Sequence, residues 1–524
     1  MSGHFTVKLL SEPKVEFGSD FVCDDPKMGI TIGGFFSKSN SSHKKEINVA
    51  LIGTGTLIVE TLNWLNIFQN RVVATETVLK DTSAVIQDGE ILDSEDLDFP
   101  GFEDADILEF NRRESNKVTN KKLNPDFLGF NKDSSFDCFF QNNAANNRDI
   151  KEREFESVLA DPNLSDIEKQ ERIIAIIEQK FADILENKVS AIDLCYILLP
   201  DVVFKKLHSV KFGKSHSNLR RKLKARLIAA DNTIPTQILV EGTVLGTKRS
   251  MQDLSMTAWN FCVASYYKAG SVPWALQVRD VDTCFIGISF SKVVSKENDL
   301  MRSSIAQAFN REGQGLVFTW KPFLWDGEKN RTKSPHLEYS YAKELIQYVL
   351  DEYRKANRHT PSRVVVHKTT DFWDHRDSKE FNELDGLRDG IAERLGSDVS
   401  MDFVAVKNSP VKILRNFGRY PVPRGTLLRM NTDECVLYTT GYIPYFELYP
   451  GTHIPHPLHV KSFGSDSHVE KLCEEILALT KLNFNNCSYY DSLPITIRFS
   501  KKVGEIIQYM PENSKPQSKY YFYM

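Results

Sequence analysis

Two patterns of apolar and polar residues alternate along this chain. Short apolar runs predict buried strands, namely EINVALIG, AIDLCYILLP and MDFVAVK. Between such runs, apolar residues recur every three or four positions, as they do in helices. Behind the capping box Ser165–Glu168, one helix face is formed by Ile173, Ile177, Phe181 and Ile184. The alternation predicts an α/β fold.

The first half of the chain contains a strand–turn–helix–strand unit of the doubly wound kind. EINVALIGTG precedes a helical stretch, TLIVETLNWLNIF, and a second strand, RVVATETVL. Gly53 and Gly55 resemble the start of a dinucleotide fingerprint, and Glu76 lies near where a ribose-binding acid would stand. Ile58 occupies the position of the third glycine. We therefore favour a tight turn and keep nucleotide binding as the alternative.

The second half begins with two β runs, VDTCFIGISFSKV and GQGLVFTWKPF, which we predict to form a hairpin. Helices and strands alternate afterwards, and this order suits a ribonuclease-H-like domain. Residues 1–45 are predicted to form an extended arm with turns, and residues 116–150 a loop.

Composition and charge narrow the functional classes. A chain of 524 residues, with 41% hydrophobic and 26% charged residues, suits a multidomain soluble protein. The net charge of −4 excludes nucleic-acid binding through the overall field, so any such binding must use local basic patches. Eight scattered cysteines without a CxxC pair, and no signal or membrane segment, predict a cytoplasmic protein. Residues 81–115 are strongly acidic; we favour a solvated loop, with a partner-docking surface as the alternative.

One local basic patch stands out in this acidic chain. Five cations fall within seven positions: Arg220, Arg221, Lys222, Lys224 and Arg226. On a helix, residues four apart share a face, so Arg220 and Lys224 can point at one anion. If the helix begins at a different residue, Lys222 takes the place of Lys224 on this face. The alternative to an anion site is a basic helix face that is exposed to solvent. A further lysine, Lys268, ends the next predicted helix.

Several phrases in this order give the chain a family resemblance. They are IPTQ, YYKAGSVPWAL, FIGISFS and LPITIRFSKKVGEII, after an opening EPKVEFG and DDPKMGITIGGFF. The chain resembles the short prokaryotic Argonautes, which have only MID and PIWI domains. The resemblance implies a Rossmann-like MID domain at 1–277, including the N-terminal arm and the acidic insertion. A ribonuclease-H-like PIWI domain is implied at 278–524.

The resemblance also implies a pocket for the 5′-phosphate of a guide strand. The matching positions are Arg220, Lys224, Gln237, Asn260 and Lys268. Ala264 departs from the family pattern, where many relatives carry lysine. The missing charge implies that Mg²⁺ binds at the guide 5′-phosphate, held in part by the C-terminal carboxylate of Met524.

The family's catalytic carboxylates are replaced at matching positions. Ser289 follows the glycine of the first PIWI strand, Lys368 and Thr369 end the second strand, and Lys501 stands on the last helix. Serine and lysine do not hold Mg²⁺ as carboxylates do, so we predict that the chain is not an enzyme. The nucleic-acid channel would be lined by Lys292, Lys321, Lys368, Arg498 and Lys501, with His367 and Lys502 beside them.

The resemblance implies a guide-dependent recognition subunit of a prokaryotic immune system. A guide, RNA by preference, would pair with a single-stranded DNA target. Pairing would activate an APAZ-domain partner carrying a TIR or sirtuin-like NADase, or a nuclease, against plasmids or phage. One alternative is an active guided endonuclease with displaced ligands such as Asp371 or Asp374. The other is a nucleotide-binding α/β enzyme using Gly53 and Gly55.

Overall fold

The structure is a computed structural model of the 524-residue chain. It describes residues 5–75, 121–213, 215–247, 252–277, 282–292, 301–310, 312–319, 323–325, 335–374, 382–414, 421–450, 454–511, 514 and 516–524.

The smaller of the two main sheets lies in the first half of the chain. Its strands run parallel in the order β10-β7-β4-β5, with β6 also on β4. The bounds are β4 Glu46–Gly53, β5 Phe139–Asn142, β6 Arg148–Asp149, β7 Leu194–Leu199 and β10 Thr236–Val240. Strand residues are buried on both faces, which explains the unbroken apolar runs in the sequence.

Helices cover both faces of this sheet. Alternate residues of β4 enter different cores: Val49 and Leu51 face one, Ala50 and Ile52 the other. The first core contains α2 (Gly55–Phe68) and α9 (Leu254–Lys268). The second contains α4 (Glu152–Ala160), α5 (Asp166–Asn187), α6 (Asp201–Leu207) and α7 (Leu219–Ile228). Short elements complete this half: α8 (Glu241–Val244) and the hairpin of β8 (Ser209–Phe212) and β9 (Ser215–Asn218).

The larger sheet has ten strands among the described residues, in the order β1-β18-β19-β20-β17-β16-β12-β13-β14, with β15 on β13. Its parallel centre is β12 (Thr283–Lys292), β16 (Arg363–Lys368) and β17 (Ser400–Asn408). The antiparallel flanks are β1 Thr6–Leu9, β13 Met301–Phe309, β14 Gly315–Thr319, β15 Phe323–Leu324, β18 Thr426–Arg429, β19 Glu434–Leu437 and β20 Leu458–Ser462.

Helices also pack on both sides of the larger sheet. One core contains α10 (Tyr339–Asn357) and α11 (Glu383–Leu395). The opposite face carries α12 (Val469–Leu479) and α13 (Ile495–Ile507). At Gly287 of β12, an added Cβ would lie 1.9 Å from the main-chain oxygen of Thr496, so glycine lets α13 approach the strand closely.

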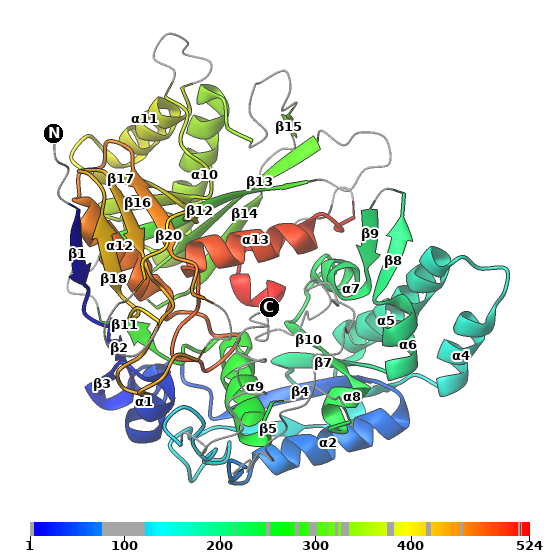
Figure 1. Ribbon diagram of the computed structural model, residues 1–524. Coiled ribbons are helices and arrows are strands. Elements are labelled where there is room, and N and C mark those ends of the chain that lie inside the picture. Colours follow the sequence, from blue (N-terminus) through cyan, green and yellow to red (C-terminus); the bar gives the residue numbers. More distant parts are fainter. Residues whose placement is uncertain are drawn as a thin grey trace, which may run out of the picture.

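The two halves share one hydrophobic core. That core continues from α9 through Trp274 to α12 and α13. A three-stranded sheet of β11 (Ala275–Leu276), β2 (Val15–Glu16) and β3 (Val22–Cys23), with α1 (Pro26–Gly33), lies beside it. The chain ends in a 3-10 turn, η6 (Tyr520–Tyr523), and Figure 1 shows this end in the middle of the molecule, between α13, α7 and α9.

The mixed α/β fold with parallel strands is confirmed, as is the capping box of α5. Three local predictions are wrong. The hairpin partner of β12 is β13, because β14 pairs with β13 instead. Residues 116–150 include strands β5 and β6 rather than only a loop. In RVVATETVL, the described part makes a single bridge, Val72 to Phe127.

The N-terminal arm also differs from the prediction. Its first strand, β1, pairs with β18 of the larger sheet, whereas the sequence assigned the arm to the first domain. The acidic segment 81–115 and Glu76 lie outside the described residues. None of the described helices combines the length and apolar character that a membrane span needs.

Candidate anion-binding site

Helix α7 divides its five cations between two directions. Three of them pair with carboxylates of neighbouring helices: Arg221 with Glu505 at 3.0 Å, Lys222 with Glu171 at 2.5 Å, and Arg226 with Glu178 at 2.7 Å. The other two, Arg220 and Lys224, are four residues apart and buried on the inner face. The side chain of Asn218 caps the helix by accepting from Arg221 N. This start places Lys224 inwards and leaves Lys222 outside.

Lys224 and Lys268 meet at the amino end of β10. Lys224 Nζ donates to the main-chain oxygen of Thr236 at 2.5 Å and to its hydroxyl at 3.1 Å. Lys268 Nζ approaches the same main-chain oxygen at 3.4 Å and also donates to Gln237 Oε1. A third acceptor of Lys268 is the main-chain oxygen of Met524, at 3.0 Å. Residues from α7, α9, β10 and the end of the chain therefore converge.

The electrostatics of this convergence are unfavourable without a ligand. Burial lowers the pKa of Lys224 to about 7, and repulsion from Lys502 on α13 adds to the shift. The pKa of Lys268 falls well below its usual range, first through burial and then through repulsion from Lys224, Lys502 and Arg220. We call these four residues, Arg220, Lys224, Lys268 and Lys502, the cation cluster.

The cation cluster has the properties of a site for a compact anion. In the part of the chain that the structure describes, neither Lys224 nor Lys268 forms an ion pair with a side-chain carboxylate. Buried charges are normally paired, because desolvating an unpaired charge is costly. A bound phosphate would supply the missing negative charge and accept several hydrogen bonds.

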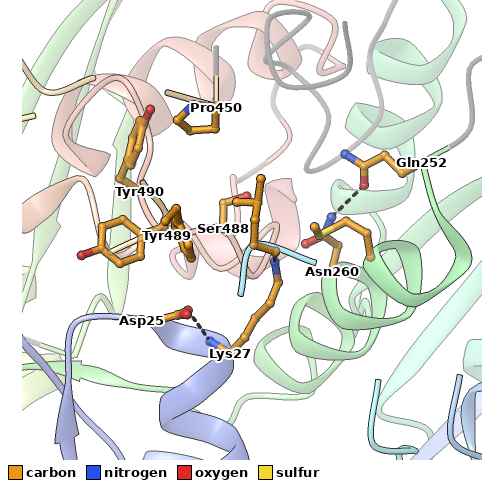
Figure 2. Close-up of a pocket in the computed structure, with 11 residues that line it drawn as sticks. Asp25, Lys27, Gln252, Asn260, Pro450, Ser488, Tyr489 and Tyr490 are labelled. Atoms are coloured by element: carbon orange, nitrogen blue, oxygen red, sulfur yellow. Dashed lines mark hydrogen bonds between the residues drawn. The ribbon is translucent and has the colours of Figure 1, made fainter. Parts of the chain in front are cut away.

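Of the two predicted amide residues, Gln237 contacts Lys268 of the cation cluster, whereas Asn260 has other partners. The Asn260 amide donates to Gln252 Oε1 at 3.1 Å and accepts from Cys487 N at 2.8 Å. It lines a pocket together with Lys27 and Asp25, and Figure 2 shows its amide directed at Gln252. Eight residues of helix, about 12 Å, separate it from Lys268, so the structure does not bring Asn260 together with the cation cluster.

Ala264 and the chain end complete the surroundings. Ala264, where the family pattern has lysine, is packed in the shared hydrophobic core. The final turn η6 is held by Tyr520, whose ring stacks on Phe499 with 3.8 Å between centroids. Met524, which follows this turn, is buried and its main-chain oxygen accepts from Lys268.

The Gly53–Gly55 turn follows the carboxyl end of β4. The cation cluster lies at the amino end of β10, so the two sites are at opposite ends of the parallel strands. Thr54 caps α2 by accepting from Leu57 N. An added Cβ at Gly53 would lie 2.6 Å from Leu198 Cβ, so close strand packing accounts for this glycine. A tight turn between β4 and α2 therefore explains Gly53 among the described residues without a bound nucleotide.

The positions that the family resemblance matched to PIWI carboxylates lie at the centre of the larger sheet. Ser289 is buried on β12 opposite Ile305 of β13. On β16, His367 bonds the Thr496 hydroxyl, and burial lowers the pKa of His367 to about 3. Thr369 follows the end of β16. Across the described ranges, no three His, Cys, Asp or Glu side chains are grouped so that they could hold a metal ion.

Lys368, predicted as a channel residue, is buried in an ion pair. Its ammonium is fully buried and lies 2.6 Å from the Glu383 carboxylate, which also lies 3.5 Å from His336. No local sequence pattern indicates this pairing. The Glu383 partner holds the ammonium inside the protein, where it cannot reach a nucleic-acid backbone.

The other predicted channel residues have different environments. Arg498 donates to Asp491 and to the Ser492 hydroxyl, and Lys501 is exposed on α13. Lys292 is described only as backbone, at the end of β12, and Lys321 lies outside the described residues. Lys502, one residue after Lys501, turns towards Lys224 and Lys268 and belongs to the cation cluster.

Known proteins provide an independent comparison. No protein-family model matches the chain. An Argonaute from Aquifex aeolicus is 22% identical over 341 residues, which cover 65% of this chain and 41% of that protein. An Argonaute from Cereibacter sphaeroides is 25% identical over 303 residues, covering 52% and 36% respectively.

The fold comparison agrees with the sequence comparison. The structure of Clostridium butyricum Argonaute bound to a guide DNA and a 19-mer target DNA superposes with a TM-score of 0.61 at 14% identity. The match covers 98% of this chain and 54% of that one. This chain is similar to Argonautes in sequence and in fold. It spans about two fifths of the length of the curated Argonautes it matches, and its two sheets correspond to the MID and PIWI architecture of the Argonaute fold.

Two interactions of the predicted site residues were missed from the sequence. Thr236 supplies the acceptors that Lys224 and Lys268 share, and Glu383 neutralises Lys368. A main-chain acceptor carries no signature in the sequence. Glu383 lies in the first turn of a helix, where acidic residues are ordinary.

Proposed function

We propose that this chain binds a guide strand through its 5′-phosphate, RNA by resemblance to the short Argonautes. The observation that carries the proposal is the cation cluster, in which Lys224 and Lys268 are buried and neither pairs with an Asp or Glu carboxylate among the described residues. We assign the MID role to residues 1–277, apart from β1, and the PIWI role to residues 278–524.

The hydrogen-bonding capacity of the site suits a terminal phosphate. Lys224 uses two of its three ammonium hydrogens on Thr236 and keeps one for a ligand. Gln237 accepts from Lys268 at Oε1, so its amide nitrogen is the atom that can donate to a phosphate. Charge-assisted bonds from such groups to phosphate are among the strongest in proteins.

The guide would continue from the cation cluster along α13 and pair with a single-stranded DNA target. Lys501, exposed on α13 next to Lys502, is suited to contact the backbone of the duplex. Base pairing would then read the sequence, and the protein would read the shape. The guide and target in the Clostridium butyricum structure support this part of the proposal.

We further propose that the PIWI half recognises the duplex without cutting it. Ser289 on β12 and the Lys368–Glu383 pair beside β16 occupy the places where the family resemblance expects metal-binding carboxylates. Output would come from an APAZ-domain partner with a TIR, sirtuin-like or nuclease effector, in defence against plasmids or phage. This last part rests on the family resemblance alone.

The proposal is tested by copurification. The tagged chain, expressed with its neighbouring open reading frames, should retain short nucleic acids that accept a radiolabel at the 5′ end only after phosphatase treatment. An APAZ-domain protein should copurify. Retained strands that label without phosphatase would contradict the phosphate site, and recovery of the chain without a partner would contradict the effector part.

A further inference from the structure

Three oxygen atoms surround the ammonium of Lys268. They are Thr236 O at 3.4 Å, Gln237 Oε1, and Met524 O at 3.0 Å. The first two are carbonyl oxygens of the main chain and of an amide, and Met524 O belongs to the carboxylate of the last residue. Oxygens of these kinds are also the ligands that hard cations such as Mg²⁺ and Ca²⁺ prefer. The nitrogen of Lys268, on a side chain only 1% exposed, thus lies where a metal bridging these oxygens would lie.

The residues present do not fit the Mg²⁺ ion that the family resemblance implied. Each oxygen of the set already accepts from Lys268, and Thr236 O also accepts from Lys224 at 2.5 Å. A divalent ion here would stand a few ångströms from two ammonium groups, inside a buried site where charges interact strongly. Further repulsion would come from Lys502 and Arg220, which already lower the pKa of Lys268.

We propose that Lys268 itself takes the place of the divalent ion, so that the 5′-phosphate is bound without metal. This inference rests on the proposed function. Lys268 directs its three hydrogens at the three protein oxygens. It acts by positioning Gln237 and the chain end, and it adds a positive charge to the site. Lys224 is the ammonium with a hydrogen left for the phosphate.

The first experiment uses the unmodified protein. Affinity for a labelled RNA of defined sequence is measured with 5′-phosphate and with 5′-hydroxyl, in Mg²⁺ and in EDTA at equal ionic strength. The inference predicts that the 5′-phosphate preference changes less than about twofold when EDTA replaces Mg²⁺. A preference that disappears in EDTA would overturn the inference and leave the proposed function intact. Equal affinity for both RNAs in both buffers would instead contradict the proposed function.

The second experiment removes the ammonium. Lys268→Met keeps the length of the side chain and frees the three oxygens. In EDTA the variant should lose about tenfold or more of its affinity for the 5′-phosphorylated RNA, the size of a lost charge-assisted contact. Mg²⁺ should restore part of that loss, because the oxygens are now available to it. Full affinity of the variant in EDTA would overturn the inference.

A matched control accompanies this variant. Lys222→Met removes the same charge from α7, where Lys222 pairs with Glu171. Lys222→Met should keep its affinity for the 5′-phosphorylated RNA in EDTA, and Mg²⁺ should not change that affinity. If Lys268→Met does not fold, as judged by its thermal unfolding, the Mg²⁺–EDTA comparison on the unmodified protein decides alone.

Discussion

Lys224 and Lys268 direct their ammonium groups at one acceptor, the main-chain oxygen of Thr236, at 2.5 and 3.4 Å. The two lysines come from different helices, 44 positions apart, and both are buried. Two like charges brought together out of water raise the free energy of the unliganded protein. Such arrangements with strongly shifted pKa values are characteristic of functional sites, where a ligand relieves the repulsion.

We expect guide binding to depend on pH because of Lys224. Its pKa is lowered to about 7 in the free protein, and a bound phosphate would raise that pKa again. Binding then takes up a proton above pH 7, so affinity for a 5′-phosphorylated strand should fall as pH rises from 7 to 9. The slope should approach about tenfold per pH unit for each proton taken up. Binding isotherms across this range measure it.

The same shift has an effect of opposite sign on the unliganded protein. A lysine whose folded-state pKa lies below its unfolded value binds more protons in the unfolded state. Its contribution to stability therefore rises as pH increases from 7 towards 10. Lys224→Met should remove this contribution to the slope of the unfolding free energy against pH. Identical slopes in the variant and the parent would contradict the assigned pKa.

We expect Glu383→Gln to destabilise the fold strongly. The substitution would leave the fully buried ammonium of Lys368 without its carboxylate. Breaking one side of a buried ion pair typically costs about 3–5 kcal/mol. Chemical denaturation measures the loss. The double variant Glu383→Gln with Lys368→Met should recover much of it, and a loss below about 1 kcal/mol for Glu383→Gln alone would contradict this role.

We expect Asn260→Ala to leave phosphate recognition unchanged. Its amide is engaged by Gln252 and Cys487 in the pocket of Figure 2, away from the cation cluster. The ratio of affinities for 5′-phosphorylated and 5′-hydroxyl strands should stay within about twofold of the parent, while stability falls by about 1 kcal/mol for the lost bonds. A collapse of the ratio would return Asn260 to the phosphate site.

The sequence predicted best what depends on neighbouring residues. The capping box of α5, the buried run of β7 and the shared face of Arg220 and Lys224 follow from local spacing, and the structure contains all three. Strand β13 was missed because MRSSIAQAF lacks a strong apolar pattern. This strand is stabilised by its pairing with β12 on one side and β14 on the other, which cannot be deduced from its local sequence.

The surroundings of the site residues that the sequence did not indicate depend on distant contacts. Lys368 is neutralised by Glu383, 15 positions later, and nothing in the local sequence indicates that contact. Asn260 and Lys268 share a helix, but the rise along that helix places them in different pockets. Contacts between distant segments determined which cations belong to the site.

The most direct test of the phosphate site compares two charge removals on the same helix. For the parent, Lys224→Met and Lys222→Met, the affinities for 5′-phosphorylated and 5′-hydroxyl RNA of one sequence are measured at pH 6.5. The parent and Lys222→Met should prefer the phosphorylated strand by about tenfold or more, and Lys224→Met should retain less than about threefold. No preference in the parent, or an equal loss in both variants, would contradict the account.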